Sequence, residues 1–423
     1  MVEKLNTIIA FVAIFGALVF FHELGHLIFA KRAGILCREF AIGFGPKVFS
    51  FKKGETLYTI RLLPLGGFVR MAGEDPEMIE VRPGQVVGLQ FTPEGKVHKI
   101  LLNNRDKYPN VKVIKVEEAD LEHGMFITGY EDESDERLQR FEIAEPAFVV
   151  SNEQEIQIAP YHRQFAAKTL GQRSMAILAG PLMNFVLAFA IFVIIGVLQG
   201  YPVDKPMIGE LTKDGAAFKA GLKQNDIVMS IDDQPISSWT EVVEVIRDHP
   251  EEELLFKINR DGEIMEISVT PEAKDVQGET IGLIGVYGPM EQSIFGAIKH
   301  GAYETYFWTK EIIVGLGLLI TGQFSLDMLS GPVGIAVSTN KVAQSGIYYL
   351  MKWGAILSIN LGIINLLPFP ALDGGRLTFF AIEALRGKPI DRHKEGVVHF
   401  IGFALLMLLM LVVTWNDIQR FFL

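Results

Sequence analysis

Four long apolar runs dominate the pattern of hydrophobic and polar positions along the chain. They cover residues 8–30, 175–198, about 347–367 and about 397–415. Each is close to the roughly 20 residues that a helix needs to cross the hydrocarbon core of a bilayer. The pattern therefore predicts a polytopic α-helical membrane protein with about four transmembrane helices. A fifth stretch, 303–322, carries three charged residues and is predicted to be an amphipathic or surface helix.

Basic residues beside the spans predict their orientation, because cytoplasmic loops carry an excess of lysine and arginine. Such residues follow the first run, precede the second, and lie between the third and the fourth. Those two loops are predicted to be cytoplasmic, with both termini and the segment 201–345 outside. The first run lacks a small-residue cleavage site after its apolar stretch, so we expect a retained helix rather than a signal peptide.

The polar segments between the runs show β-like patterns. Within 207–273, strand-like pieces at 227–231 and 254–258 flank a helix-like stretch at 240–248. On the cytoplasmic side, 40–69 is predicted to form short strands with turns. The polar, acidic segment from about 74 to 159 is predicted to be a β-rich subdomain, in which the charged run 131–137 is a solvated face.

Composition narrows the function classes. The net charge of −11 argues against a nucleic-acid binder, which needs a basic face. The single cysteine, Cys37, excludes an internal disulfide framework and a cysteine-built metal cluster, and it is predicted to be inert.

The strongest chemical signal is the pentapeptide His22-Glu23-Leu24-Gly25-His26 in the first run. Residues four apart share one face of a helix, so both imidazoles can reach a single Zn²⁺ ion. Glu23 beside them suits the role of general base. Ionisable groups inside an apolar span are costly and mark functional sites, so a purely structural role for all three is disfavoured.

A catalytic zinc site needs a third protein ligand, and Asp373 is the best candidate. It lies in the Pro/Gly-rich segment 367–375, just after the third run. His98, His123, His162, His249 and His300 lie in polar or surface-like sequence, and His393 and His399 flank the last run, where a surface or interfacial role is expected.

The predicted topology supports Asp373 independently. His22 and His26 lie 14 and 18 residues past Ile8, which places them about 21 and 27 Å into a core about 30 Å thick. Asp373 follows the cytoplasmic end of the third run. Both ligand sets are therefore predicted at the same depth, near the cytoplasmic side. Proline and glycine there imply broken helix, which is tolerated at that depth where protein or a water cavity surrounds it.

Three asparagines in the spans could hold a substrate backbone or stabilise an oxyanion: Asn365 and Asn360 in the third run and Asn184 in the second. Hydrogen bonding between helices is the alternative.

The chain resembles the bacterial site-2 protease family of intramembrane zinc metalloproteases. The resemblance rests on the His-Glu-Leu-Gly-His motif, Ala179-Gly180-Pro181-Leu182-Met183-Asn184, a segment resembling a PDZ domain, and Asn360 to Pro368 running into Leu372-Asp373-Gly374-Gly375. Ser330-Gly331-Pro332-Val333-Gly334 adds a further family-like element. The PDZ resemblance includes Ala220-Gly221-Leu222-Lys223 and Asp226, with Asn225-Asp226 replacing the usual Gly-Asp.

The resemblance implies that His22, His26 and Asp373 bind zinc, that Glu23 is the catalytic base, and that Asn365 contacts the substrate chain. It also implies that a hairpin near 61–69 presents substrate as an added strand. Substrates would be single-pass membrane proteins, such as anti-sigma factors and remnant signal peptides, trimmed first by another protease. The PDZ domain would contact peptide or substrate, although a spacer with an unused groove is the alternative.

The predicted organisation has six parts. Residues 1–73 hold the first transmembrane helix and the hairpin, 74–172 the acidic β-rich insertion, 173–200 the second helix, and 201–275 the PDZ domain. Residues 276–345 are predicted to be amphipathic linker helices, and 346–423 hold the third and fourth helices. Two other functions stay open: a membrane zinc transporter, which would place ionisable groups across the whole bilayer, and an inactive PDZ scaffold.

Overall fold

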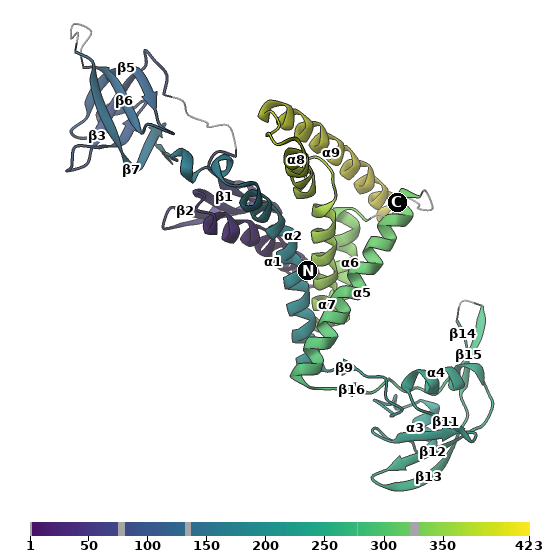
Figure 1. The fold of residues 1–423 in the computed structure, drawn as a ribbon. Coiled ribbons are helices and arrows are strands. Elements are labelled where there is room, and N and C mark those ends of the chain that lie inside the picture. Colours follow the sequence, from purple (N-terminus) through teal and green to yellow (C-terminus); the bar gives the residue numbers. More distant parts are fainter. Residues whose placement is uncertain (1, 75–80, 132–136, 277, 322–329) are drawn as a thin grey trace. The chain divides into compact units, whose positions relative to one another are not determined.

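The computed structural model describes residues 2–74, 81–131, 137–276, 278–321 and 330–423. It divides into two compact units, Met1–Ala188 with Trp308–Leu423, and Phe189–Phe307. Most of the helical residues that the structure describes lie in the long helices α1 (Val2–Arg32), α2 (Leu170–Gln199), α5 (Ile294–Ile320), α6 (Pro332–Gln344), α7 (Ile347–Leu366), α8 (Asp373–Arg386) and α9 (Arg392–Phe422) (Figure 1).

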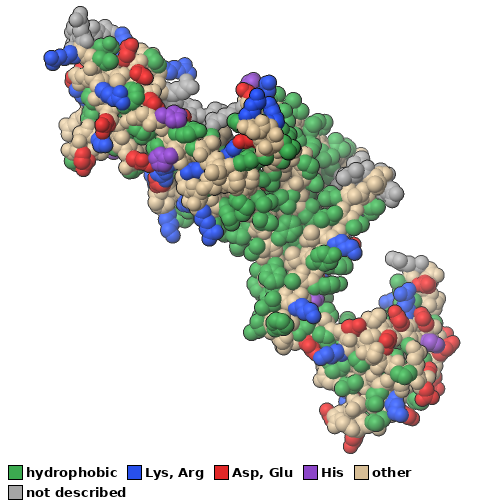
Figure 2. Space-filling model, viewed as in Figure 1, with side chains coloured by type: hydrophobic (Ala, Val, Ile, Leu, Met, Phe, Trp, Pro, Cys, Tyr) green, Lys and Arg blue, Asp and Glu red, His purple; other side chains and the backbone are tan. Residues whose placement is uncertain are grey.

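Four of these helices are long and apolar enough to cross a membrane. Among the described residues they are Ile9–Arg32, Leu170–Gln199, Ile347–Leu366 and His393–Phe422. They match the four predicted runs. The fourth is longer than the predicted 397–415, and only 11% of its most apolar window is buried. Hydrophobic side chains cover much of the visible surface of the helices, whereas charged side chains are spread over the β-rich parts (Figure 2).

Two predictions about the remaining helices need correction. The fifth stretch is helical, but α5 begins at Ile294, nine residues before the predicted start at 303; Gly322 lies outside the described residues. The segment between the third and fourth runs was predicted to be a loop, and most of it is helix α8. Helix α7 ends at Leu366 because Pro368 and Pro370 cannot donate backbone hydrogen bonds. A new helix then starts at Asp373.

The segment after α1 forms one folded sheet rather than the predicted short strands. It consists of β1 (Cys37–Lys53) and β2 (Thr56–Met71), which pair antiparallel. Phe40 pairs with both Tyr58 and Val69, so the first half of β1 lies between two parts of β2. The second half of β1 pairs with the first part of β2, as Phe51 does with Tyr58. Among the described residues, these pairings leave 67–71 at an edge of the sheet.

The polar segment after this sheet forms a small barrel, as the prediction of a β-rich subdomain anticipated. Its strands are β3 (Val86–Phe91), β4 (Val97–Leu101), β5 (Lys112–Asp120), β6 (Phe126–Tyr130), β7 (Gln139–Ser151) and β8 (Gln154–Gln157). Their order is β4-β3-β5-β6-β7-β8, and a parallel pairing of β4 with β7 closes the sheet on itself. Inward side chains such as Leu89, Ile100 and Ile127 form its core. Of the charged run 131–137, residues 132–136 lie outside the described residues.

Three short 3₁₀ helices belong to the same segment: η1 (Arg105–Lys107), η2 (Tyr161–Arg163) and η3 (Phe165–Ala167). The last two lead into α2. There Arg163 donates two hydrogen bonds, of 2.8 and 2.6 Å, to the carboxylate of Glu55 in the β1–β2 turn. These contacts join the turn to the entry of α2, and together with the neighbouring Gln157 they hold the pKa of Glu55 down to about 2.

The second unit has the alternating order expected from 207–273. It contains α3 (Ala216–Ala220), α4 (Trp239–Asp248), and a sheet in the order β11 (Gln234–Pro235), β10 (Ile227–Ile231), β12 (Leu254–Arg260), β13 (Glu263–Val269). Two strand pairs complete it: β14 (Glu272–Val276) with β15 (Glu279–Leu283), and β9 (Tyr201–Pro202) with β16 (Met290–Glu291). Its core includes Ile284, so the packed unit extends past the predicted boundary at 275. Residues 279–283 are strand rather than linker helix.

Candidate metal centre

Two helices far apart in sequence bring three metal-ligating side chains together. Helix α1 carries His22 and His26 one turn apart, and Asp373 is the first residue of α8. The two Nε2 atoms lie 3.2 Å from each other. They lie 3.3 and 3.4 Å from Oδ2 of Asp373. In the described part of the chain, this is the group of three such side chains whose ligand atoms all lie within 4.8 Å of one another.

The spacing of these atoms fits zinc. Bonds of about 2.0–2.1 Å in a tetrahedral site place neighbouring ligand atoms roughly 3.3–3.4 Å apart. The three observed distances, 3.2, 3.3 and 3.4 Å, form one face of such a tetrahedron. Oδ2 of Asp373 is buried and has no hydrogen-bond donor among the described residues. A buried acceptor beside two imidazole nitrogens is what a cation would satisfy, and the fourth corner stays open for chemistry.

Both imidazoles are oriented by contacts from α2. Nδ1 of His26 lies 2.8 Å from the carbonyl oxygen of Ala176. This oxygen accepts a hydrogen bond from the Nδ1–H group, which leaves the Nε2 lone pair for a metal. Nδ1 of His22 lies 3.1 Å from the side-chain amide of Asn184. The amide atom at this distance is Nδ2, and Oδ1 of Asn184 is buried without a hydrogen-bond partner among the described residues. A His22 that bound metal through Nε2 would carry its proton on Nδ1, and a flipped Asn184 amide would accept it through Oδ1.

Asn184 is therefore not placed as an open substrate contact. Its side chain is fully buried, and its backbone carbonyl accepts a hydrogen bond of 2.9 Å from Ser358 of α7. Asn184 lies next to His22 because α2 packs against α1. The sequence pattern alone did not reveal this contact.

Glu23 faces a cavity of about 440 Å³ beside the candidate metal ligands, although the residue is only 8% exposed. The cavity is also lined by the edge segment 67–71 of β2 and by Asn365. The side-chain amide nitrogen of Asn365 donates a hydrogen bond of 3.0 Å to the carbonyl oxygen of Leu361. The amide oxygen of Asn365 is not used in this bond and can accept another hydrogen bond. Asn360 is partly buried on α7 and is not among the described residues that line this cavity.

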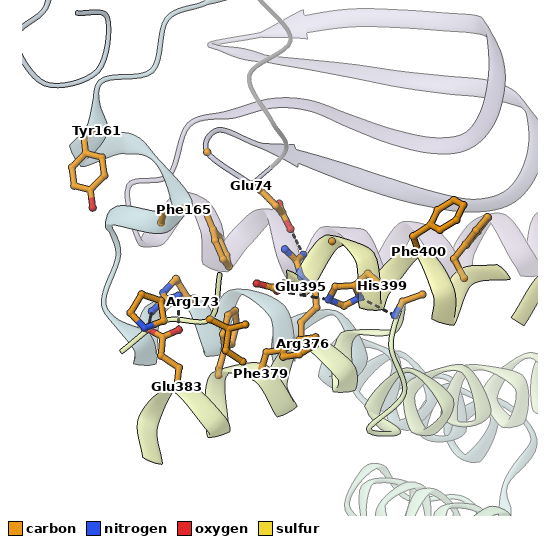
Figure 3. A pocket seen from close by; sticks show the side chains of 18 residues that line it. Glu74, Tyr161, Phe165, Arg173, Arg376, Phe379, Glu383, Glu395, His399 and Phe400 are labelled. Atoms are coloured by element: carbon orange, nitrogen blue, oxygen red, sulfur yellow. Dashed lines mark hydrogen bonds and ion pairs between the residues drawn. The ribbon is translucent and has the colours of Figure 1, made fainter. Parts of the chain in front are cut away.

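The sequence analysis missed an ion pair in the wall of this cavity. Arg376, one turn after Asp373 on α8, pairs with Glu74, which follows β2. Burial by itself would lower the pKa of Arg376, but the adjacent Glu74 carboxylate outweighs it and raises this pKa. Beyond the pair lies a second cavity of about 970 Å³, bounded mainly by α8 and α9 (Figure 3). A signal for Arg376 was its i,i+3 spacing from Asp373.

Substitution of Gly180 tests the contact between α1 and α2. A Cβ added at Gly180 would overlap the imidazole of His26. We expect Gly180→Ala to displace that ring and to lower zinc affinity by about 10–100-fold, the usual range for residues supporting a ligand. Zinc affinity of the purified chain, measured against a chelator, checks this. Gly171→Ala, where a Cβ on the same helix meets nothing within 4 Å, should bind zinc like wild type. Equal affinities of the two variants would contradict the expectation.

Comparison with known proteins identifies the family. The model of peptidase family M50 matches residues 10–409. The zinc metalloprotease RasP of Geobacillus kaustophilus (strain HTA426) is 74% identical over 423 residues, which is 100% of each chain. The regulator of sigma-W protease RasP of Bacillus subtilis (strain 168) is 59% identical over 419 residues, which is 99% of each chain.

Among solved structures, the PDZ domain of an SdrC-like protein from Listeria monocytogenes is 17% identical, with a TM-score of 0.18. It covers 21% of this chain and 90% of its own. The family match spans nearly the whole chain, and it includes both helices that hold the metal-ligating triangle. The chain therefore belongs to peptidase family M50, the site-2 proteases, and is a zinc metallopeptidase.

Proposed function

We propose that this enzyme is an intramembrane endopeptidase that hydrolyses peptide bonds within the transmembrane segments of single-pass membrane proteins. The observation that carries the proposal is that two corners of the candidate metal-ligating triangle, His22 and His26, lie on α1, one of the four helices apolar enough to span a bilayer. A cavity of about 440 Å³ and a strand edge adjoin the triangle. The poorly buried apolar surface of α9 supports a lipid environment.

In this proposal His22, His26 and Asp373 hold Zn²⁺, and Glu23 is the general base. Zinc, when bound, would acidify water and polarise the scissile carbonyl. Glu23 lines the same cavity as the ligands, so its carboxylate can take a proton from water there and pass it to the leaving amine. Asn184 orients His22 and so serves substrate hydrolysis indirectly.

The edge segment 67–71 is proposed to receive the substrate as an added strand. A helical substrate must unwind before attack, because its peptide groups are hydrogen-bonded within the helix. Pairing with a strand edge would replace those lost bonds and would hold the extended chain against the cavity. The available oxygen of Asn365 supports the proposal that this residue contacts the substrate backbone. Asn360 is not among the described residues that line this cavity, so a contact of its amide with substrate would lie outside it.

The wider assignments follow from the same hypothesis. The enzyme would be a multi-pass protein of the bacterial plasma membrane, with the metal centre near the cytoplasmic side and the PDZ-like unit outside. That unit would exclude untrimmed ectodomains. Substrates would include anti-sigma factors, in keeping with the name of the Bacillus subtilis relative, and remnant signal peptides. A transporter would need ionisable groups across the bilayer, whereas the described residues hold one such metal-ligating group.

Cleavage of a defined substrate in liposomes tests the proposal. Purified enzyme is reconstituted with a single-pass protein whose ectodomain can be removed beforehand, and the products are mapped by mass. We expect cuts within the apolar segment, faster for the trimmed substrate, and none with Glu23→Gln. Cuts confined to water-exposed loops would contradict the intramembrane function. Equal rates for both substrate forms would contradict the trimming requirement.

A further inference from the structure

The loop that leads to the third metal ligand has a backbone conformation that needs support. This loop, 367–372, joins α7 to α8. Its residue Ala371 has a φ of 77°, in the left-handed region that a residue with a side chain rarely adopts. Such conformations persist only where surrounding contacts hold them. Asp373 follows two positions later, so the contacts that hold Ala371 also set where the ligand begins α8.

Helix α9 supplies one of these contacts through His399. The backbone N–H of Ala371 donates to Nδ1 of His399 at 2.8 Å (Figure 3). The imidazole also packs edge to face against Phe379 of α8, with ring centroids 5.4 Å apart. One side chain of α9 therefore contacts both the loop and the helix that Asp373 begins.

The second nitrogen of this imidazole faces an acid. Nε2 of His399 lies 3.7 Å from Oε1 of Glu395, one turn earlier on α9. A histidine that accepts at Nδ1 must carry its proton on Nε2 when neutral. The Glu395 carboxylate favours a proton on that side, and so favours the tautomer that can accept from Ala371.

Gly402 brings α9 against the same loop independently. It lies three residues after His399, on the same face of the helix. A Cβ added there would lie 2.5 Å from the carbonyl oxygen of Pro370 and 2.7 Å from its carbonyl carbon. Two positions on α9 thus hold two consecutive loop residues, one by a hydrogen bond and one by backbone contact.

We propose that His399 is a positioning residue of the metal centre. By accepting the N–H of Ala371, it fixes the direction in which the chain enters α8, and with it the distance of Asp373 from His22 and His26. The proposal rests on the assignment of Asp373 as a zinc ligand. It gives α9 a part in metal binding beyond that of an apolar span.

A pair of polar substitutions at His399 separates hydrogen bonding from packing. Asparagine places its amide oxygen near the position of Nδ1 and can accept from Ala371, whereas glutamine places it near the position of Nε2. We expect His399→Asn to bind Zn²⁺ like wild type. We expect His399→Gln to bind it about tenfold more weakly, at the lower end of the range for residues that support a ligand. Competition between the full-length purified chain and a chelator measures both.

Two control variants accompany this pair, one on α9 and one at a candidate metal ligand on α1. His393→Gln, at an exposed position of α9, should leave zinc affinity unchanged. His22→Ala should abolish zinc binding. If His22→Ala still binds zinc, the assignment of the metal ligands is wrong. That outcome differs from one in which only the positioning role of His399 is wrong. Equal zinc affinity of His399→Asn and His399→Gln, whether both normal or both reduced, would overturn the positioning role.

Gly402→Ala tests the inference without touching a polar group. The added methyl must displace Pro370, so zinc affinity should fall as it does for His399→Gln. With a model peptide as substrate, kcat should fall while KM stays nearly unchanged. The substitution displaces Asp373, whereas the strand edge 67–71 that is proposed to bind substrate stays in place. Gly396→Ala, where a Cβ on α9 meets nothing within 4 Å, is the matched control. Wild-type zinc affinity in Gly402→Ala would contradict the claim that α9 positions the loop.

Discussion

Replacing Glu23 by glutamine should stop peptide-bond hydrolysis while the protein keeps its zinc. The amide has nearly the shape of the carboxylate but cannot take up a proton at neutral pH. Loss of a general base typically costs about 10²–10⁴-fold in rate. The three metal-ligating atoms belong to other residues, so the metal content should not change. Single-turnover cleavage of a transmembrane substrate measures the rate, and elemental analysis measures the zinc.

The Glu23 variant also separates catalysis from binding. Since the strand edge 67–71 is intact in it, substrate should still associate, and the uncleaved complex should be isolable and identifiable by mass. Glu244→Gln, at an exposed position of α4, is the matched control and should cleave like wild type. Hydrolysis at the wild-type rate by Glu23→Gln would show that another group is the base.

Replacing Asp373 by asparagine should remove most of the zinc and, with it, the activity. Oδ2 of Asp373 closes the triangle with two imidazoles at 3.3 and 3.4 Å, and it is the one anionic member. An amide supplies no negative charge and binds zinc poorly. The loss of affinity should therefore exceed the roughly 100-fold upper range for residues that only support a ligand. Zinc retained after dialysis against a chelator is the measurement.

Added zinc should restore part of the lost activity. Excess Zn²⁺ can refill a weakened site by mass action, so cleavage by Asp373→Asn should rise with zinc concentration, whereas cleavage by Glu23→Gln should not. Asp248→Asn, at an exposed position of α4, should behave like wild type in both assays. Normal zinc retention by Asp373→Asn would exclude Asp373 as a ligand, and the triangle would then need another explanation.

The sequence by itself determined those features that depend on local spacing. The four apolar runs could be recognised because a helix of given length and composition either can or cannot span a bilayer. The pairing of His22 with His26 and the place of Glu23 follow from 3.6 residues per turn. The family could be recognised from its short motifs, and the match over residues 10–409 confirmed it.

Tertiary structure decided the contacts between segments distant in sequence, because those depend on packing that no local pattern encodes. Hydropathy could not show that residues 367–372 form a short loop followed at once by helix α8. Nor could it show that β1 pairs with two parts of β2 and leaves 67–71 as an edge. His399 was expected to have a surface or interfacial role. Only the packing of α9 placed its imidazole where Nδ1 accepts a hydrogen bond from the backbone N–H of Ala371. Local spacing identified His22 and His26 as candidate metal ligands, and the tertiary structure decided that Asp373, at the start of α8, lies beside them.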